Sequence, residues 1–158
     1  MRFPIGTIQR RANAITSSLG EKMMTFSELK HKSSCILFKA RSAFPFDIFP
    51  NDIIVDSEKV NVILRLFFGS QQIHSIPIKN ISDLSVEHSI FFATLHILPG
   101  RVFENQVVSI DKLKRSDAIK ARNIIQGLVI ADRENVEIEN LIHTENGIDE
   151  LESLGKPI

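Results

Sequence analysis

The sequence predicts a small antiparallel β structure that is followed by one C-terminal helix. Between residues 52 and 110, short apolar segments recur with Gly, Pro or Asn between them, which is typical of antiparallel strands joined by turns. From Asp111 onward, the apolar spacing changes from two residues to three or four, as on the buried face of a helix. The chain has 158 residues, which is long enough to bury a core without a disulfide or a metal.

Six segments are expected to be strands. The clearest is 59–68, where Val60, Val62, Leu64, Leu66 and Phe68 alternate with their neighbours and should share one face. The other expected strands are 52–56, 72–78, 81–89, 92–98 and 105–110. Ahead of these strands, residues 44–50 contain Pro45 and Pro50. Two prolines this close together exclude a helix and indicate an extended, buried entry segment.

A helix is predicted from Asp111 to about residue 131, with Asp111 or Ser116 as its N-cap. Gly127 lies inside this helix and indicates that another backbone approaches closely there, because glycine otherwise weakens a helix. Beyond Arg133 the chain is polar and acidic. We expect this tail to be weakly ordered, with at most one short amphipathic turn around Leu151.

Charge divides the chain into three parts. Residues 1–43 carry eight basic and two acidic side chains, a net charge of +6, whereas residues 44–131 carry nine of each. Residues 132–158 carry two basic and eight acidic side chains, a net charge of −6. The sequence therefore predicts a basic, partly helical extension (1–43), a domain (44–131) and an acidic tail (132–158).

The composition favours a binding protein inside the cell. The eleven phenylalanines without any Tyr or Trp indicate core filling and disfavour a stacking platform for nucleic acid. Cys35 is the only cysteine, so no intramolecular disulfide can form. We find neither a transmembrane run nor a secretory signal, and expect a cytoplasmic protein that is at most peripheral to the inner face of the membrane.

No motif in the sequence indicates catalysis. Phosphate-binding glycine loops, nucleophile elbows and zinc-protease motifs are all missing. By strand parity, His88 and His96 should lie on opposite faces of the sheet, so they do not indicate a metal site. We therefore expect no enzyme activity, no catalytic or metal-binding residue and no cofactor.

Several packing motifs resemble bacterial pleckstrin-homology-like domains. The similar segments are 53–56, 59–60, 76–78, 81–84 and 89–97, with 117–119 and 124–128 matching the last helix of that family. Residues 44–50 resemble small bacterial proteins in which a helical leader precedes such a domain. The resemblance implies an antiparallel barrel or sandwich of six to seven strands capped by one C-terminal helix. It transfers no catalytic residue.

Two basic clusters are candidate contacts. The first lies in the extension and could meet an anionic surface; it comprises Arg10, Arg11, Lys22, Lys30 and Lys32. The alternative is that the acidic tail neutralises it. The second comprises Lys112, Lys114 and Arg115, where strand gives way to helix, and the alternative is a solvated helix start. The connection between the first two expected strands is residues 56–59, which are mainly acidic. The resemblance would place a phosphoinositide site in that connection, and the acidic residues argue against one.

The expected function is that of a non-catalytic binding module. Its partner is most simply another protein, held at a strand edge or in the groove beside the last helix. The alternative is peripheral attachment to an anionic membrane through residues 1–43. The sequence identifies neither a particular partner nor an oligomeric state.

Overall fold

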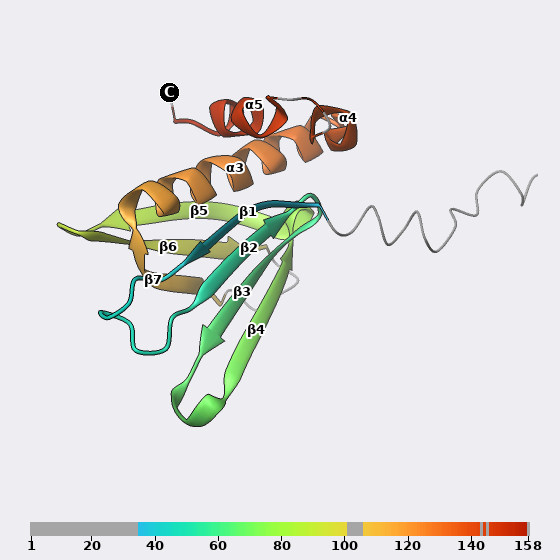
Figure 1. The fold of residues 1–158 in the computed structure, drawn as a ribbon. Helices are drawn as coiled ribbons and strands as arrows, with labels where there is room; N and C mark the ends of the chain where they lie inside the picture. Colours follow the sequence, from blue (N-terminus) through green and yellow to red (C-terminus); the bar gives the residue numbers. More distant parts are fainter. Residues whose placement is uncertain (1–34, 101–105, 143, 145, 158) are drawn as a thin grey trace, which may run out of the picture. The chain divides into compact units, whose positions relative to one another are not determined.

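The computed structural model describes residues 35–100, 106–142, 144 and 146–157. Residues from Cys35 onward form one compact unit, in which seven antiparallel strands make two sheets and a helix packs on them (Figure 1). This is the fold class that the sequence predicts, and its layout is the one that the pleckstrin-homology-like resemblance implies.

The first sheet has four strands in sequence order, β1-β2-β3-β4. Its apolar residues alternate as expected of half-buried strands, and Val60 and Val62 of β3 are fully buried. The short helix η1 (Phe67–Gly69) forms the tip of the β3–β4 hairpin. The bounds are β1 (Ile36–Arg41), β2 (Asp52–Asp56), β3 (Lys59–Arg65) and β4 (Gln71–Pro77).

The second sheet has the order β5-β6-β7 and follows a short helix, η2 (Ile78–Asn80). Its central strand alternates strictly, with Ala93, Leu95 and Ile97 buried and their neighbours partly exposed. The bounds are β5 (Ile81–His88), β6 (Phe92–Pro99) and β7 (Val108–Lys114).

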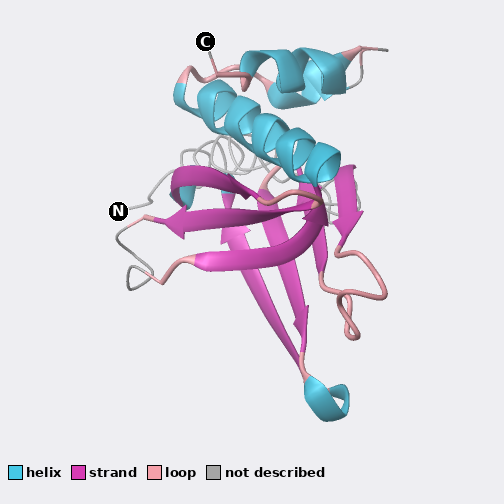
Figure 2. Cartoon of the chain, turned by 90° about the vertical axis from the view of Figure 1, so that its left-hand side faces the viewer, coloured by secondary structure: helices cyan, strands magenta, loops and turns pink. Residues whose placement is uncertain are grey.

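Helix α3 (Arg115–Arg133) packs across both sheets and closes the core. Two shorter helices, α4 (Ile138–Ile142) and α5 (Gly147–Leu154), lie on the other side of α3, away from the sheets (Figures 1 and 2). None of the helices in the described part of the chain combines the length and the apolar composition needed to cross a membrane.

The core is aliphatic. The largest fully buried side chains are all Ile, Leu or Val: Ile53, Leu95, Ile97, Ile110, Leu113, Ile124, Ile125, Leu128, Leu151, Val55, Val60 and Val62. Each of the eight phenylalanines among the described residues is exposed or half-buried. The prediction that phenylalanine fills the core is therefore wrong for this part of the chain.

The domain begins earlier than predicted. Strand β1 lies inside the stretch 1–43, for which the sequence predicts a partly helical extension, and it pairs with β2. Leu37 and Ala40 are buried in the core, so this end of the stretch belongs to the first sheet. Residues 1–34, which hold the rest of the expected extension, lie outside the described residues.

Strand β7 is longer than expected at its C-terminal end. It continues to Lys114, so the helix begins at Arg115 and not at Asp111, and neither Asp111 nor Ser116 caps it. Leu113, which fits the helical pattern equally well, is fully buried opposite Ala93 of β6. A short apolar run that fits both the two-residue period of a strand and the 3.6-residue period of a helix cannot be assigned to either by spacing alone.

The described part of the tail is ordered, contrary to the prediction. Leu151 of α5 is fully buried, and Ile138, Leu141 and Ile142 pack against the core. Gly127 is where α3 meets α5, because a Cβ atom there would overlap the backbone carbonyl of Leu151. The close backbone approach predicted at Gly127 is thus confirmed, and the approaching backbone belongs to the tail.

Replacing Gly127 by alanine should destabilise the protein. In an open helix this change would add about 1 kcal/mol of stability. Here the added methyl group must push α5 away from α3, which we expect to cost about 1–3 kcal/mol in urea unfolding. The same substitution in a chain that ends at residue 146 is the control, because α5 is then gone and the change should be stabilising. An equal effect in both chains would contradict this account.

Candidate functional site

Three loops lie in a row along one edge of the unit. They are residues 43–51 between β1 and β2, residues 66–70 between β3 and β4, and residues 89–91 between β5 and β6. In Figures 1 and 2 the first loop lies between the other two; the β3–β4 tip is the farthest from α3, whereas the β5–β6 turn lies near the first turn of α3. We call these three loops the loop row.

The loop row exposes large apolar side chains. Eight of them are more than half exposed: Phe44, Phe46, Ile48, Leu66, Phe67, Phe68, Ile90 and Phe91. Phe68 is 94% exposed and lies at the hairpin tip, where its backbone takes the left-handed conformation with φ 62°. The expected buried entry segment at 44–50 is therefore wrong, since its apolar side chains face outward.

Aromatic contacts join the three loops. Phe46 of the first loop lies 4.9 Å from Phe92, which follows the β5–β6 loop, measured between ring centroids. Phe49 lies 5.3 Å from Phe67 at the hairpin tip, and Phe67 lies 4.8 Å from Phe68. Ring contacts thus join loop 43–51 to the start of β6 at one point and to the hairpin tip at another.

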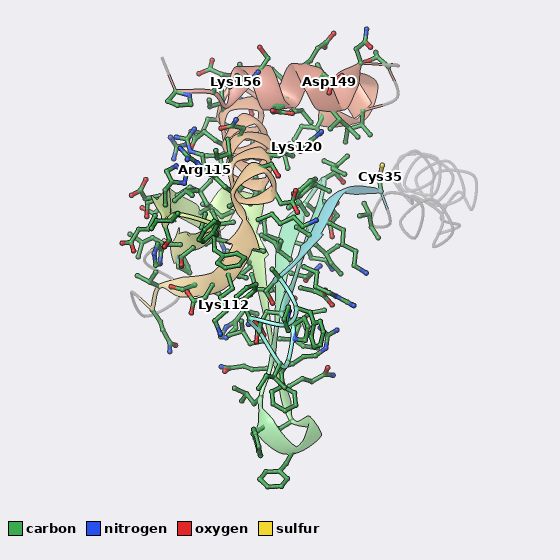
Figure 3. All side chains as sticks on the ribbon, turned by 60° about the vertical axis from the view of Figure 1, so that its left-hand side comes forward. Cys35, Lys112, Arg115, Lys120, Asp149 and Lys156 are labelled. Carbon is green, nitrogen blue, oxygen red and sulfur yellow. The ribbon has the colours of Figure 1, made fainter. Side chains whose placement is uncertain are left out.

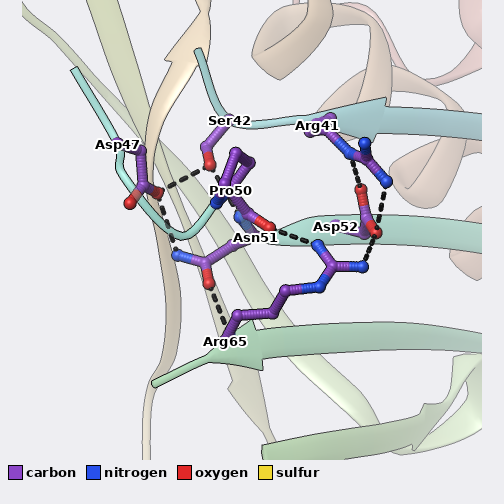
Figure 4. A network of polar contacts seen from close by, with 7 residues as sticks. All are labelled: Arg41, Ser42, Asp47, Pro50, Asn51, Asp52 and Arg65. Carbon is purple, nitrogen blue, oxygen red and sulfur yellow. Dashed lines mark hydrogen bonds and ion pairs between the residues drawn. The ribbon is translucent and has the colours of Figure 1, made fainter. Parts of the chain in front are cut away.

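A polar network holds the base of loop 43–51 (Figure 4). Ser42 donates its hydroxyl to the Asp47 carboxylate at 2.7 Å and accepts the backbone N–H of Asn51, also at 2.7 Å. The Asn51 side chain donates to Asp47 at 3.3 Å and accepts the backbone N–H of Arg65 at 2.8 Å. These bonds fix both ends of the loop, so its apolar side chains are directed outward.

Asp52 ties the network to three strands. Its buried carboxylate accepts Arg41 Nε at 2.6 Å and Arg65 Nη2 at 2.6 Å, and Arg65 also donates to the Pro50 carbonyl. The hydrogen bond from Arg41, supported by the one from Arg65, holds the pKa of Asp52 below its ordinary value of 3.8 despite the opposing effect of burial.

The second predicted basic cluster borders the loop row. The backbone carbonyl of Lys112 accepts the N–H of Ala43 at 2.8 Å, and Lys114 pairs with Phe92 in the β6–β7 ladder. Lys112, Lys114 and Arg115 are all exposed. In Figure 3, Lys112 lies between the first turn of α3, where Arg115 stands, and the hairpin tip.

The first predicted basic cluster lies outside the described residues; it comprises Arg10, Arg11, Lys22, Lys30 and Lys32. The structure also changes which loop joins the first two strands of the domain: it is 42–51, not 56–59. Loop 42–51 is not basic either, because Asp47 is its only charged side chain. It therefore lacks the basic residues that a phosphoinositide loop would need.

His88 and His96 lie on opposite faces of the second sheet, as predicted. His88 stands opposite the buried Ala93, whereas His96 stands opposite the exposed Ser85, which places the two on different faces. His96 Nδ1 lies 2.8 Å from the Ser109 hydroxyl, a cross-strand polar pair, and its Nε2 lies 3.6 Å from Glu87. Among the described residues, no three His, Cys, Asp or Glu side chains are grouped as a metal site would require.

Sequence reasoning missed the loop row although a signal was present. Seven of the eight described phenylalanines stand in three short segments, FPFDIFP, LFFG and IFF. Each of these segments is the expected entry segment or lies at the end of an expected strand, next to a turn. Aromatic residues concentrated in such places indicate a surface, whereas the interpretation relied on their total number.

The comparisons with known proteins identify no relative. No protein-family model matches the chain, and neither a curated protein nor a solved structure matches it significantly. The candidate site therefore rests on its geometry alone.

Replacing Asp52 by asparagine should weaken folding in a pH-dependent way. At pH 7 we expect a loss of about 1.5–3 kcal/mol, because hydrogen bonds to a charged group disappear. A carboxyl whose pKa is lowered by folding stabilises the protein above its unfolded pKa, and this contribution is lost as pH falls through the folded pKa. The difference between the two proteins should therefore shrink below about pH 4.

Urea unfolding between about pH 7 and about pH 2.5 measures this effect. The matched control is Asp83→Asn, an exposed carboxylate on β5, which should change stability little at any pH. A difference between wild type and Asp52→Asn that stays constant over the whole range would show that the carboxylate charge is not the cause.

Proposed function

We propose that this chain is a non-catalytic binding module of the pleckstrin-homology-like type, and that the loop row is its docking surface. The observation that carries the proposal is the set of eight exposed apolar side chains on three neighbouring loops, which ring contacts join at two points. Contiguous exposed apolar surface of this kind marks interaction sites in folded proteins.

Energetics support docking at the loop row. Fully burying one phenylalanine side chain stabilises a complex by about 1.5–3 kcal/mol relative to leaving it in water. Five of the eight apolar side chains are phenylalanines, and the polar network already holds loop 43–51 in its outward conformation. Little conformational entropy is then lost when a partner covers this loop.

The groove beside the last helix does not support the proposal. The sequence made it a candidate surface, but α5 packs closely on α3: Leu151 is fully buried, and a side chain at Gly155 would overlap the Asn123 carbonyl. Docking through the loop row leaves this internal contact intact.

Photo-crosslinking tests the proposal and does not require the partner to be identified first. Benzoylphenylalanine replaces Phe68 in the full-length chain in living cells, a conservative change because this ring is almost fully exposed. We expect covalent adducts, to protein or to lipid, after irradiation. The control places the same group at Leu154, which is exposed on α5, and should give few adducts.

Two results would count against the loop row. One is that position 68 gives no adduct beyond background. The other is that positions 68 and 154 give the same adducts in the same yield, which would indicate random collision.

A further inference from the structure

We infer that β4 pairs edge to edge with β4 of a second copy of this chain, so that two first sheets join across a two-fold axis. The inference goes beyond the proposed function, because it concerns a sheet edge and not the loop row. Three observations carry it: the backbone groups on the open side of β4, the lack of the features that usually protect such an edge, and the compatibility of the strand with itself.

The open side of β4 offers backbone hydrogen-bonding groups. Within the described part of the chain, β3 is the only ladder neighbour of β4 (Figure 1). At one end of that ladder the N–H of Leu66 donates to the Ser70 carbonyl at 2.8 Å, and at the other end the N–H of Ile78 donates to the Glu58 carbonyl, also at 2.8 Å. In an antiparallel ladder, pairs bonded in this way alternate with pairs whose backbone groups point away. The N–H groups directed to the open side of β4 are therefore those of Gln71, Ile73 and Ser75.

The other strands at the margins of the two sheets are protected, whereas β4 is not. Strands β1, β5 and β7 each carry charged side chains, and the register of each with its neighbour is irregular. Charges and bulges are the usual means by which proteins prevent edge-to-edge pairing. Strand β4 contains no Asp, Glu, Lys or Arg, and its seven residues pair with β3 without a break. Pro77 is its one unfavourable residue and stands at its end.

A second copy of β4 fits this edge because the strand is compatible with itself. Like charges that face each other across a ladder are destabilising, so a strand with a net charge would repel its own copy. The charged residues that pair with the two ends of β4, Lys59 and Arg65, belong to β3 and lie one strand away from the open side. Ile73 is 56% exposed although it pairs with Ile63, and an apolar side chain on its open side would cover it.

The sequence of β4 also selects a register. With Ile73 on the two-fold axis, this residue lies opposite Ile73 of the second copy, and each Gln71 lies opposite Ser75. All of these residues direct their backbone groups to the open side, so each pair exchanges both backbone hydrogen bonds. Pro77, which has no N–H to donate, falls outside the paired segment. The two isoleucines form an apolar cross-strand pair.

Sedimentation equilibrium of the full-length protein tests the inference. We expect the apparent mass to rise from that of a monomer toward twice that value as the protein concentration increases. A contact along one strand is small compared with the roughly 800 Å² per partner of a standard interface, so the association should be reversible. A protein that stays monomeric at every concentration would overturn the inference.

A charged residue at the axis should prevent association. Ile73→Lys places two lysines opposite each other and removes the apolar pair, so we expect self-association to weaken about tenfold or more. The matched control is Leu154→Lys, the same change at an exposed position of α5, which should leave self-association unchanged. Circular dichroism checks that both variants are folded. Equal self-association of the two variants would count against β4 as the contact.

Mixing two charged variants tests whether position 73 faces itself. Ile73→Lys and Ile73→Glu should each be largely monomeric, whereas an equal mixture should associate more strongly than either alone, because opposite charges then meet at the axis. A mixture that is as monomeric as its components would reject the two-fold pairing.

A proline tests the backbone groups. Gln71→Pro removes an N–H that is directed to the open side, and Ser70 already has φ −72° and ψ 146°, a conformation that is allowed before proline. The dimer loses two hydrogen bonds, so we expect self-association to weaken about tenfold. The control Gln71→Ala keeps the N–H and should associate as wild type does. If the proline and alanine variants associate equally, the strand edge is not the contact.

These outcomes separate the inference from the proposed function. Loss of self-association in Ile73→Lys, with adducts from position 68 to another protein retained, would show that the sheet edge and the loop row are separate surfaces. A monomeric wild-type protein that still gives those adducts would reject the dimer alone.

Discussion

The carboxylate of Asp52 is the constraint on which the candidate site depends. It is buried at the start of β2 and accepts hydrogen bonds from β1 and β3 through Arg41 and Arg65. Arg65 in turn reaches the Pro50 carbonyl and, through its backbone, Asn51. A buried carboxylate is tolerated only when it is paired and hydrogen-bonded in this way. The same contacts fix where the first loop leaves the sheet, and so where its phenylalanines lie.

The loop row and the core contain different kinds of apolar side chain. The interior uses Ile, Leu, Val and Ala, which pack closely between two sheets and α3. The aromatic rings in the described part of the chain are left at the margin or in the loops. An aliphatic core of this kind does not need phenylalanine for its stability, so the exposed rings call for an explanation outside folding.

The fold was more predictable from the sequence than the candidate site. Strands that alternate over several residues, such as β3 and β6, and the long apolar stripe of α3 lie close to their expected positions. In contrast, β1 lies in a stretch that was expected to be a partly helical extension, and the end of β7 fits the strand period and the helix period alike. The tail is held by a contact at Gly127 whose partner only the tertiary structure reveals. The three phenylalanine-rich turns can be recognised in the sequence from their residue types. Their proximity depends on strand order and on pairs far apart in the chain, such as Ala43 with Lys112.

The position of the acidic helices has an electrostatic consequence. Helices α4 and α5 lie on the far side of α3 from the sheets, and α5 carries Asp149, Glu150 and Glu152. A helix with its side chains is about 10 Å thick, which exceeds the screening length of about 8 Å in physiological salt. The negative charge of α5 is therefore shielded from anything that touches the loops. A charged partner at the loops would therefore meet the local side chains Asp47, Lys112 and Lys114 and not the acidic residues of α5.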